Sequence, residues 1–72
     1  MSKNIGENIR ELRIKKNMTQ KELAERIFVT PQAISKWERG VGYPDILQMV
    51  PLADIFDVSI DMLFGRGIDK KI

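Results

Sequence analysis

The segment from Thr19 to Gly40, TQKELAERIFVTPQAISKWERG, restricts the fold more than any other part of this 72-residue chain. It predicts two short helices that meet at a tight corner. Thr19 followed by Glu22 is a capping box, which begins the first of the two helices. Thr30 supplies a capping hydroxyl for the second, and Pro31 takes the first helical position, where its missing N–H costs no hydrogen bond. Two helices of about two turns each, joined by roughly three or four residues, form a helix-turn-helix.

Apolar residues at helical spacing predict which side of each helix is buried. The residues expected to face inward along the whole chain are Ile5, Ile9, Leu12, Leu23, Ala24, Ile27, Ile34, Trp37, Leu52, Ala53, Phe56, Ile60 and Leu63. The opposite side of the second helix of the pair carries Gln32, Ala33 and Lys36, which are small, polar or basic. Glutamine and lysine can hydrogen-bond base edges in a major groove, while alanine and Pro31 can contact a thymine methyl. The alternative is an ordinary solvated surface, but the capped two-helix pattern favours DNA recognition.

The runs TQKELAERI, VTPQAISKWERG, YPDI and LADIFDVSIDMLFG resemble the Xre-type, lambda-repressor-like helix-turn-helix family of bacterial and phage regulators. The resemblance extends from about Ile5 to Gly65. It implies an all-α, compact domain of five short helices, in which the second and third form the helix-turn-helix and the third reads the major groove. We therefore expect one DNA-binding domain over residues 1–65 and a short polar C-terminal tail at 66–72.

Carried over position by position, the resemblance implies two sets of DNA contacts and one structural ion pair. The positions expected to read bases are Pro31, Gln32, Ala33 and Lys36. The positions expected to contact phosphates are Thr19, Gln20, Ser35, Arg39 and Tyr43. For Tyr43, packing beneath the loop after Gly40 is an equal alternative. The resemblance also pairs Arg13 with Glu38, with exposure of both residues as the alternative.

Two residues depart from the family pattern. Phe28 stands where many relatives have glycine, so the corner either holds a left-handed residue or turns differently. Pro51 lies one place later than the proline of many relatives, and proline deep inside a helix removes a hydrogen bond. The fourth helix is therefore expected to begin near Val50 or to carry Pro51 in its first turn, after a turn capped by Asp45. It is expected to end at Phe56.

The two outer helices have their own termination patterns. Asn4 and Glu7 form a second capping box, which predicts a first helix from Asn4 to Lys16. Asn17 can end that helix in a left-handed conformation. Ser59 is expected to cap a short final helix that ends before Gly65.

The chain has no cysteine and no histidine, so disulfides, thiolate metal sites and the commonest general base are excluded. No apolar run reaches the length of a membrane span, and the N-terminus has no signal-peptide hydrophobic region. We therefore expect a cytoplasmic protein that is not an enzyme, needs no cofactor or metal, and has no membrane partner. No small-molecule ligand is evident.

The formal net charge is only +2, but it is unevenly distributed. Residues 1–39 contain nine basic and five acidic side chains, a net charge of +4, whereas residues 40–72 contain three basic and five acidic, a net charge of −2. The positive half is the half that carries the helix-turn-helix, as DNA binding requires. An imbalance of this size also arises by chance, so it supports the interpretation without establishing it.

Apolar residues at the C-terminal end exceed what so small a core can bury. Ile55, Met62, Phe64 and Ile68 are therefore expected to form a homodimer interface. Together these features predict a sequence-specific regulator of transcription that binds double-stranded DNA, acting as a dimeric repressor on a palindromic operator. The alternative is an antitoxin or protein-interaction adaptor on the same fold. The nine residues after Leu63 are few for a toxin-binding segment, which argues against the antitoxin.

Overall fold

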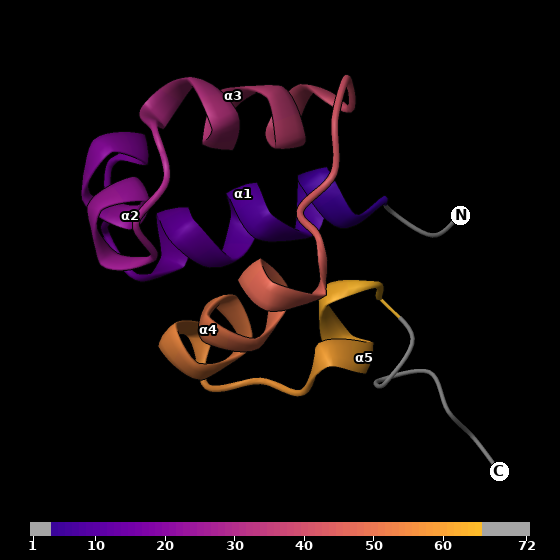
Figure 1. Ribbon diagram of the computed structural model, residues 1–72. Coiled ribbons are helices and arrows are strands. Elements are labelled where there is room, and N and C mark those ends of the chain that lie inside the picture. The colour runs from indigo at the N-terminus through magenta and orange to yellow at the C-terminus, as the bar shows by residue number, and fades with distance from the viewer. Residues whose placement is uncertain (1–3, 66–72) are drawn as a thin grey trace, which may run out of the picture.

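The computed structural model describes residues 4–65, and over this range the domain is all-α, as the sequence predicts. The helices in this range are α1 (Ile5–Lys15), α2 (Gln20–Arg26), α3 (Pro31–Arg39), α4 (Ile46–Phe56) and α5 (Ile60–Leu63). In Figure 1, α1 crosses the middle of the domain, with α3 along one side and α4 and α5 along the other. The tail expected at 66–72 lies outside the described residues.

The core takes one large, fully buried side chain from each described helix. These side chains are Ile9, Leu23, Ile34, Leu52 and Leu63. All of them belong to the apolar sides predicted from helical spacing. The other residues expected to face inward are buried as well, apart from Leu12 and Ile60, which are half-buried against the core. Burying each aliphatic side chain contributes about 1.5–3 kcal/mol relative to exposure. The core therefore ties all five described helices together at one point.

The helices begin at the residues whose side chains were expected to cap them. Asn4 and Glu7 form a complete capping box before α1, and Thr19 and Glu22 form another before α2. Thr30 accepts a hydrogen bond from the backbone N–H of Ala33 at 3.1 Å, with Pro31 at the first position of α3. Ser59 caps α5 in the same way. These short-range hydrogen bonds satisfy donors that a helix N-terminus otherwise leaves free.

Each described helix is followed by a residue with positive φ. These residues are Asn17 (φ 58°), Phe28 (φ 61°), Gly40 (φ 80°), Asp57 (φ 58°) and Gly65 (φ 76°). After α1 to α4, the next backbone N–H donates to the carbonyl five residues earlier, as from Val29 to Ala24 at 3.0 Å. This is the Schellman arrangement, which requires a left-handed residue. Phe28 therefore adopts the left-handed conformation, which was one of the two alternatives for the corner.

The expectation for the start of the fourth helix was wrong. α4 is one helix from Ile46 to Phe56, and Pro51 lies in its interior, not in its first turn. Asp45 begins the helix by accepting a hydrogen bond from the N–H of Leu47 at 3.0 Å, so the capping signal extends into α4 itself. Pro51 has no backbone N–H, so the carbonyl of Leu47 lacks the hydrogen bond that a helix normally provides. That carbonyl belongs to a turn that faces solvent, where Leu47 is 80% exposed. Packing of the apolar residues on both sides of Pro51 against the core keeps the helix continuous.

Within residues 4–65, none of the helices combines the length and the hydropathy needed to cross a bilayer.

Candidate nucleic-acid interface

The second helix of the helix-turn-helix is fixed by its inner side. Ile34 and Trp37 of α3 are buried, as predicted, and Val29 in the connection from α2 is half-buried against the same core. The connection rises from the C-terminal end of α2 to the N-terminal end of α3 (Figure 1). Since both helices contribute to one core, the outer side of α3 has a defined orientation.

The outer side of α3 carries the residues expected to read bases. Pro31, Gln32 and Lys36 are exposed, whereas Ala33 is half-buried and packs against the core. Gln32 and Lys36 are four residues apart and therefore lie on the same side of the helix. Within residues 4–65, neither side chain makes a hydrogen bond or ion pair with another described residue, so both are free to bind a ligand. From residue 26 to residue 37 the chain has no acidic side chain.

The five residues expected to contact phosphates differ in what they already bind. The hydroxyl oxygen of Thr19 accepts from the N–H of Glu22 at 3.0 Å, which leaves its hydroxyl proton available to a phosphate. Arg39 donates through Nε to the hydroxyl of Ser35 at 3.2 Å, so these two side chains lie together at the end of α3. Tyr43 is 70% exposed, so its ring does not pack beneath the loop.

Gln20 lies at the first position of α2 and has a partner that the sequence did not reveal. Its Nε2 donates to Oε1 of Glu38 at 3.0 Å, and the residue is half-buried. One amide proton and the backbone N–H, which lies at the free N-terminal end of the helix, remain for a phosphate. Gln20 can therefore contribute to both the fold and a phosphate contact.

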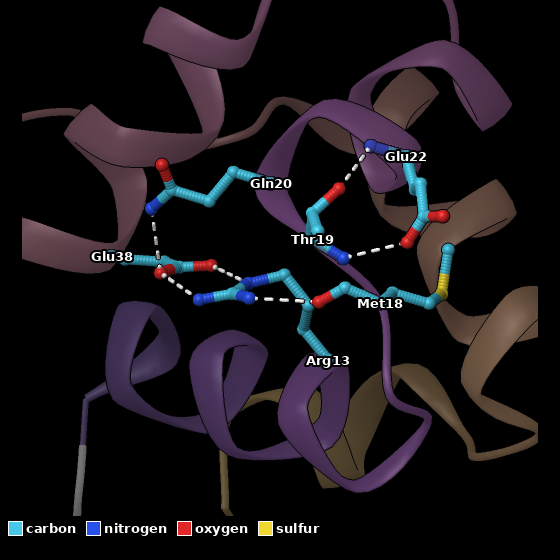
Figure 2. Close-up of polar contacts among 6 residues, drawn as sticks. All are labelled: Arg13, Met18, Thr19, Gln20, Glu22 and Glu38. Atoms are coloured by element: carbon cyan, nitrogen blue, oxygen red, sulfur yellow. Dashed lines mark hydrogen bonds and ion pairs between the residues drawn. The ribbon is translucent and has the colours of Figure 1, made fainter.

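Arg13 and Glu38 form an ion pair that joins α1 to the end of α3 (Figure 2). Arg13 donates through Nε to Oε2 of Glu38 at 2.7 Å and through Nη2 to Oε1 at 3.0 Å, the bidentate geometry that favours strong pairs. Its Nη1 donates to the carbonyl oxygen of Met18 at 2.8 Å, in the connection to α2. The Arg13 and Glu38 side chains are only 13% and 4% exposed.

The hydrogen bond to Glu38 raises the pKa of Arg13 above its ordinary value, with help from the charge attraction and against the opposing effect of burial. The guanidinium is therefore charged at every pH near neutrality. Together with Gln20 and Met18, this polar cluster connects α1, α2 and α3 at one place (Figure 2).

A second attachment of α3 to α1 depends on Gly6. A β-carbon at Gly6 would overlap the backbone carbonyl oxygen of Trp37 and would lie 3.2 Å from Cα of Glu38. The two helix backbones can approach this closely only because glycine has no side chain. The sequence signal for this close approach is a glycine inside the first turn of a helix, where glycine is otherwise unfavourable. The C-terminal end of α3 is thus held through its backbone by Gly6 and through Glu38 by Arg13.

The described residues expected at a dimer interface are only partly exposed. Ile55 and Met62 are half-buried, and Ile55 packs against the core. Phe64 is 42% exposed, and Ile68 lies outside the described residues. More apolar area is exposed at the start of α4, where Ile46, Leu47 and Val50 face solvent. We refer to these three residues as the α4 apolar surface.

Comparison with known proteins agrees with this arrangement. The family model described as Helix-turn-helix matches residues 9–63. The chain is 46% identical over 60 residues to the HTH-type transcriptional activator BcrR of Enterococcus faecalis, an alignment that covers 83% of this chain and 29% of BcrR. The chain therefore spans less than a third of that relative's length.

Two solved structures extend the comparison to three dimensions. The P22 c2 repressor in complex with a synthetic operator is similar with a TM-score of 0.83 and 32% identity, over 88% of this chain and 96% of that chain. SinR, a master regulator for biofilm formation solved in complex with DNA, is similar with a TM-score of 0.75 and 32% identity, over 82% and 95% of the two chains. The family match spans most of the chain, and its capped α2, corner and α3 are all present in the structure. The chain therefore belongs to the helix-turn-helix family, in its Xre-type, lambda-repressor-like form.

Proposed function

We propose that this domain binds double-stranded DNA sequence-specifically and regulates transcription, with α3 lying in the major groove. The observation that carries the proposal is the outer side of α3. There Gln32 and Lys36 are exposed and have no side-chain partner among residues 4–65, while Glu38 and Trp37 hold the helix. The similar P22 c2 and SinR domains, whose structures contain DNA, support it. Because the proposed ligand is DNA, we assign the protein to the cytoplasm, with no catalytic role.

We propose that base reading and phosphate binding belong to different parts of the interface. Gln32 and Lys36 offer donors to base edges, and Pro31 and Ala33 offer apolar contact to a thymine methyl. The phosphate contacts come from the exposed ends of α2 and α3 and from the following loop. Their members are Thr19, Gln20, Ser35, Arg39 and Tyr43.

We further propose that two copies bind a palindromic operator. One α3 reads too few base pairs to select a single site among the non-specific competitors of a genome. Two copies related by a two-fold axis double the site, and their half-sites would lie about one helical turn, roughly 34–36 Å, apart. The α4 apolar surface is a stronger candidate for the contact than Ile55 or Met62, because its side chains are exposed whereas those two residues are half-buried.

Three side chains are few compared with the roughly 1,200–2,000 Å² buried in stable interfaces. Dimerisation would therefore be weak in solution and would be completed on DNA. Occupation of a promoter by such a pair excludes other proteins from it, so we propose repression as the mode of regulation.

Selection from a random pool of duplex DNA, followed by mobility shifts at low and moderate salt, tests this function. We expect an enriched motif with two-fold symmetry, bound in a salt-sensitive manner. Lys36→Ala should weaken binding to that motif. Lys15→Ala is the matched control, because Lys15 lies on the side of α1 that faces Met62, away from α3, and its loss should have little effect. Failure of the wild-type protein to bind any duplex at any salt concentration would refute the proposal.

An antitoxin or protein-interaction adaptor is the alternative function, and the α4 apolar surface is the observation that favours it. Exposed apolar residues on one helix are also typical of surfaces that bind a different protein. The selection experiment separates the DNA-binding regulator from a protein-interaction adaptor, since an adaptor would yield no enriched motif.

A further inference from the structure

Each of the five described helices is followed by a residue in the left-handed conformation, but the residue that follows α2 is of a type that this conformation disfavours. The left-handed position after α1, α3, α4 and α5 is filled by Asn17, Gly40, Asp57 and Gly65. Glycine has no β-carbon to oppose this conformation, and asparagine and aspartate tolerate it best among other residues. After α2 the position is filled by Phe28, with a φ of 61°. A bulky residue in this region is a genuine outlier.

Packing does not compensate for the strain at Phe28. The residue is 92% exposed, so its ring gains almost nothing from the core. Two neighbours in the chain behave differently, since Ile27 is buried and Val29 is half-buried against the core. Glycine or asparagine at position 28 would keep the hydrogen bond from Val29 to Ala24 and would relieve the strain. The stability of the fold therefore does not account for phenylalanine here, and strained positions of this kind are enriched at functional sites.

The location of Phe28 favours DNA as the ligand for its ring. It lies in the connection of the helix-turn-helix, two residues before the N-cap of α3. Thr30, Pro31 and Gln32 follow it as an exposed run. The surrounding segment from Arg26 to Lys36 contains basic but no acidic side chains, which suits a polyanion.

We propose that Phe28 is a DNA contact, with its ring packed against a thymine methyl at the edge of the half-site read by α3. The inference rests on the proposed function and extends it to a residue outside the recognition helix. Apolar contact with the thymine methyl is an established form of base recognition, and it releases no counterions. Phe28 should therefore contribute to affinity and to thymine preference at one edge of the site, without changing the dependence of binding on salt.

The decisive experiment measures thermal stability and DNA affinity together for Phe28→Gly and Phe28→Asn. Both variants should melt at a higher temperature than the wild-type protein. Both should also bind the selected operator about fivefold to 150-fold more weakly, the scale of one lost base contact. The slope of log affinity against log salt should be unchanged, whereas a variant that loses a phosphate contact should lower that slope by about 1. Phe28→Leu, which keeps an apolar side chain, should retain most of the affinity.

Asn17→Gly is the matched control, because Asn17 holds the same backbone conformation at the end of α1. It should leave DNA affinity unchanged. Equal weakening by Asn17→Gly and Phe28→Gly would trace the loss to backbone freedom at helix ends and would overturn the assignment.

Wild-type affinity in both Phe28→Gly and Phe28→Asn would also overturn it, and would point to a protein partner for the ring. These outcomes are distinct from failure of the proposed function, in which the wild-type protein itself selects no operator.

Discussion

The ion pair between Arg13 and Glu38 gives the sharpest prediction for stability, and Glu38→Ala is the informative change. The Glu38 carboxylate accepts three hydrogen bonds, two from Arg13 and one from Gln20, and its side chain is 4% exposed. The Arg13 side chain is 13% exposed in the intact pair, and removing Glu38 leaves its guanidinium with the Met18 carbonyl as its one acceptor among residues 4–65. The variant therefore loses all three hydrogen bonds and also retains the poorly solvated charge of Arg13.

Breaking a buried pair costs about 3–5 kcal/mol, and the partial exposure of Arg13 lowers our expectation to about 2–4 kcal/mol. For a domain of this size each kcal/mol lowers the melting temperature by about 4–8 °C, so the expected decrease is roughly 8–30 °C. A core this small supplies only about 3–5 kcal/mol of net stability. Glu38→Ala should therefore be partly unfolded at room temperature.

A double-mutant cycle measured by urea denaturation in the cold tests this reasoning. Arg13→Ala, Glu38→Ala and the double variant are compared with the wild-type protein, and the double variant should lose clearly less stability than the sum of the two single losses. Arg10→Ala, which removes an exposed arginine from the same helix, should change stability by less than about 0.5 kcal/mol. Additivity of the two single losses to within about 0.3–0.5 kcal/mol would refute the coupling.

The remaining predictions concern DNA binding, assembly and helix packing. Gln32→Ala and Lys36→Ala should each weaken binding to the selected operator by about 1–3 kcal/mol and relax the base preference of the domain. Gln20→Ala should weaken binding to all duplexes about equally, because a phosphate contact carries no base identity. A selected motif that changes with Gln20→Ala alone would contradict this separation of base reading from phosphate binding. Leu47→Glu should abolish cooperative binding to a full palindrome and preserve weak binding to a half-site, and equal one-to-one binding of both DNAs by the wild-type protein would exclude the dimer. Gly6→Ala should destabilise the domain by about 1–3 kcal/mol, because the Trp37 carbonyl occupies the space that a β-carbon needs. A melting curve like that of the wild-type protein would show that α1 and α3 can separate freely.

Helix termini and core residues could be predicted because they depend on short-range chemistry. A capping hydroxyl, such as that of Thr19 or Thr30, predicts the start of a helix in any protein. Apolar residues every three or four positions, such as Ile34, likewise predict the buried side of a helix. Pro51 shows where such local rules fail. Its cost to the helix is local, but the packing that outweighs the cost involves residues from other helices.

The features that the sequence did not reveal all depend on distances between helices. The bond from Gln20 to Glu38 joins residues 18 positions apart, and the close approach at Gly6 joins α1 to the end of α3. The exposure of Leu47 likewise follows from which side of α4 meets the core. Periodicity alone could not decide this, because α4 is apolar on almost every side.

The attachment of α3 at its C-terminal end has a consequence for how such a domain can diverge. Trp37 and Glu38 carry the attachments to α1, whereas the exposed side chains of Gln32 and Lys36 contribute to neither the core nor the polar cluster. Exposed substitutions of this kind usually change folding free energy by less than about 0.5 kcal/mol. A lineage can therefore exchange the residues at positions 32 and 36 without compensating changes elsewhere in the chain, and under the proposed function this exchange changes the operator that the domain recognises. The same independence makes these two positions the natural ones to randomise when the domain is redirected to a new DNA sequence.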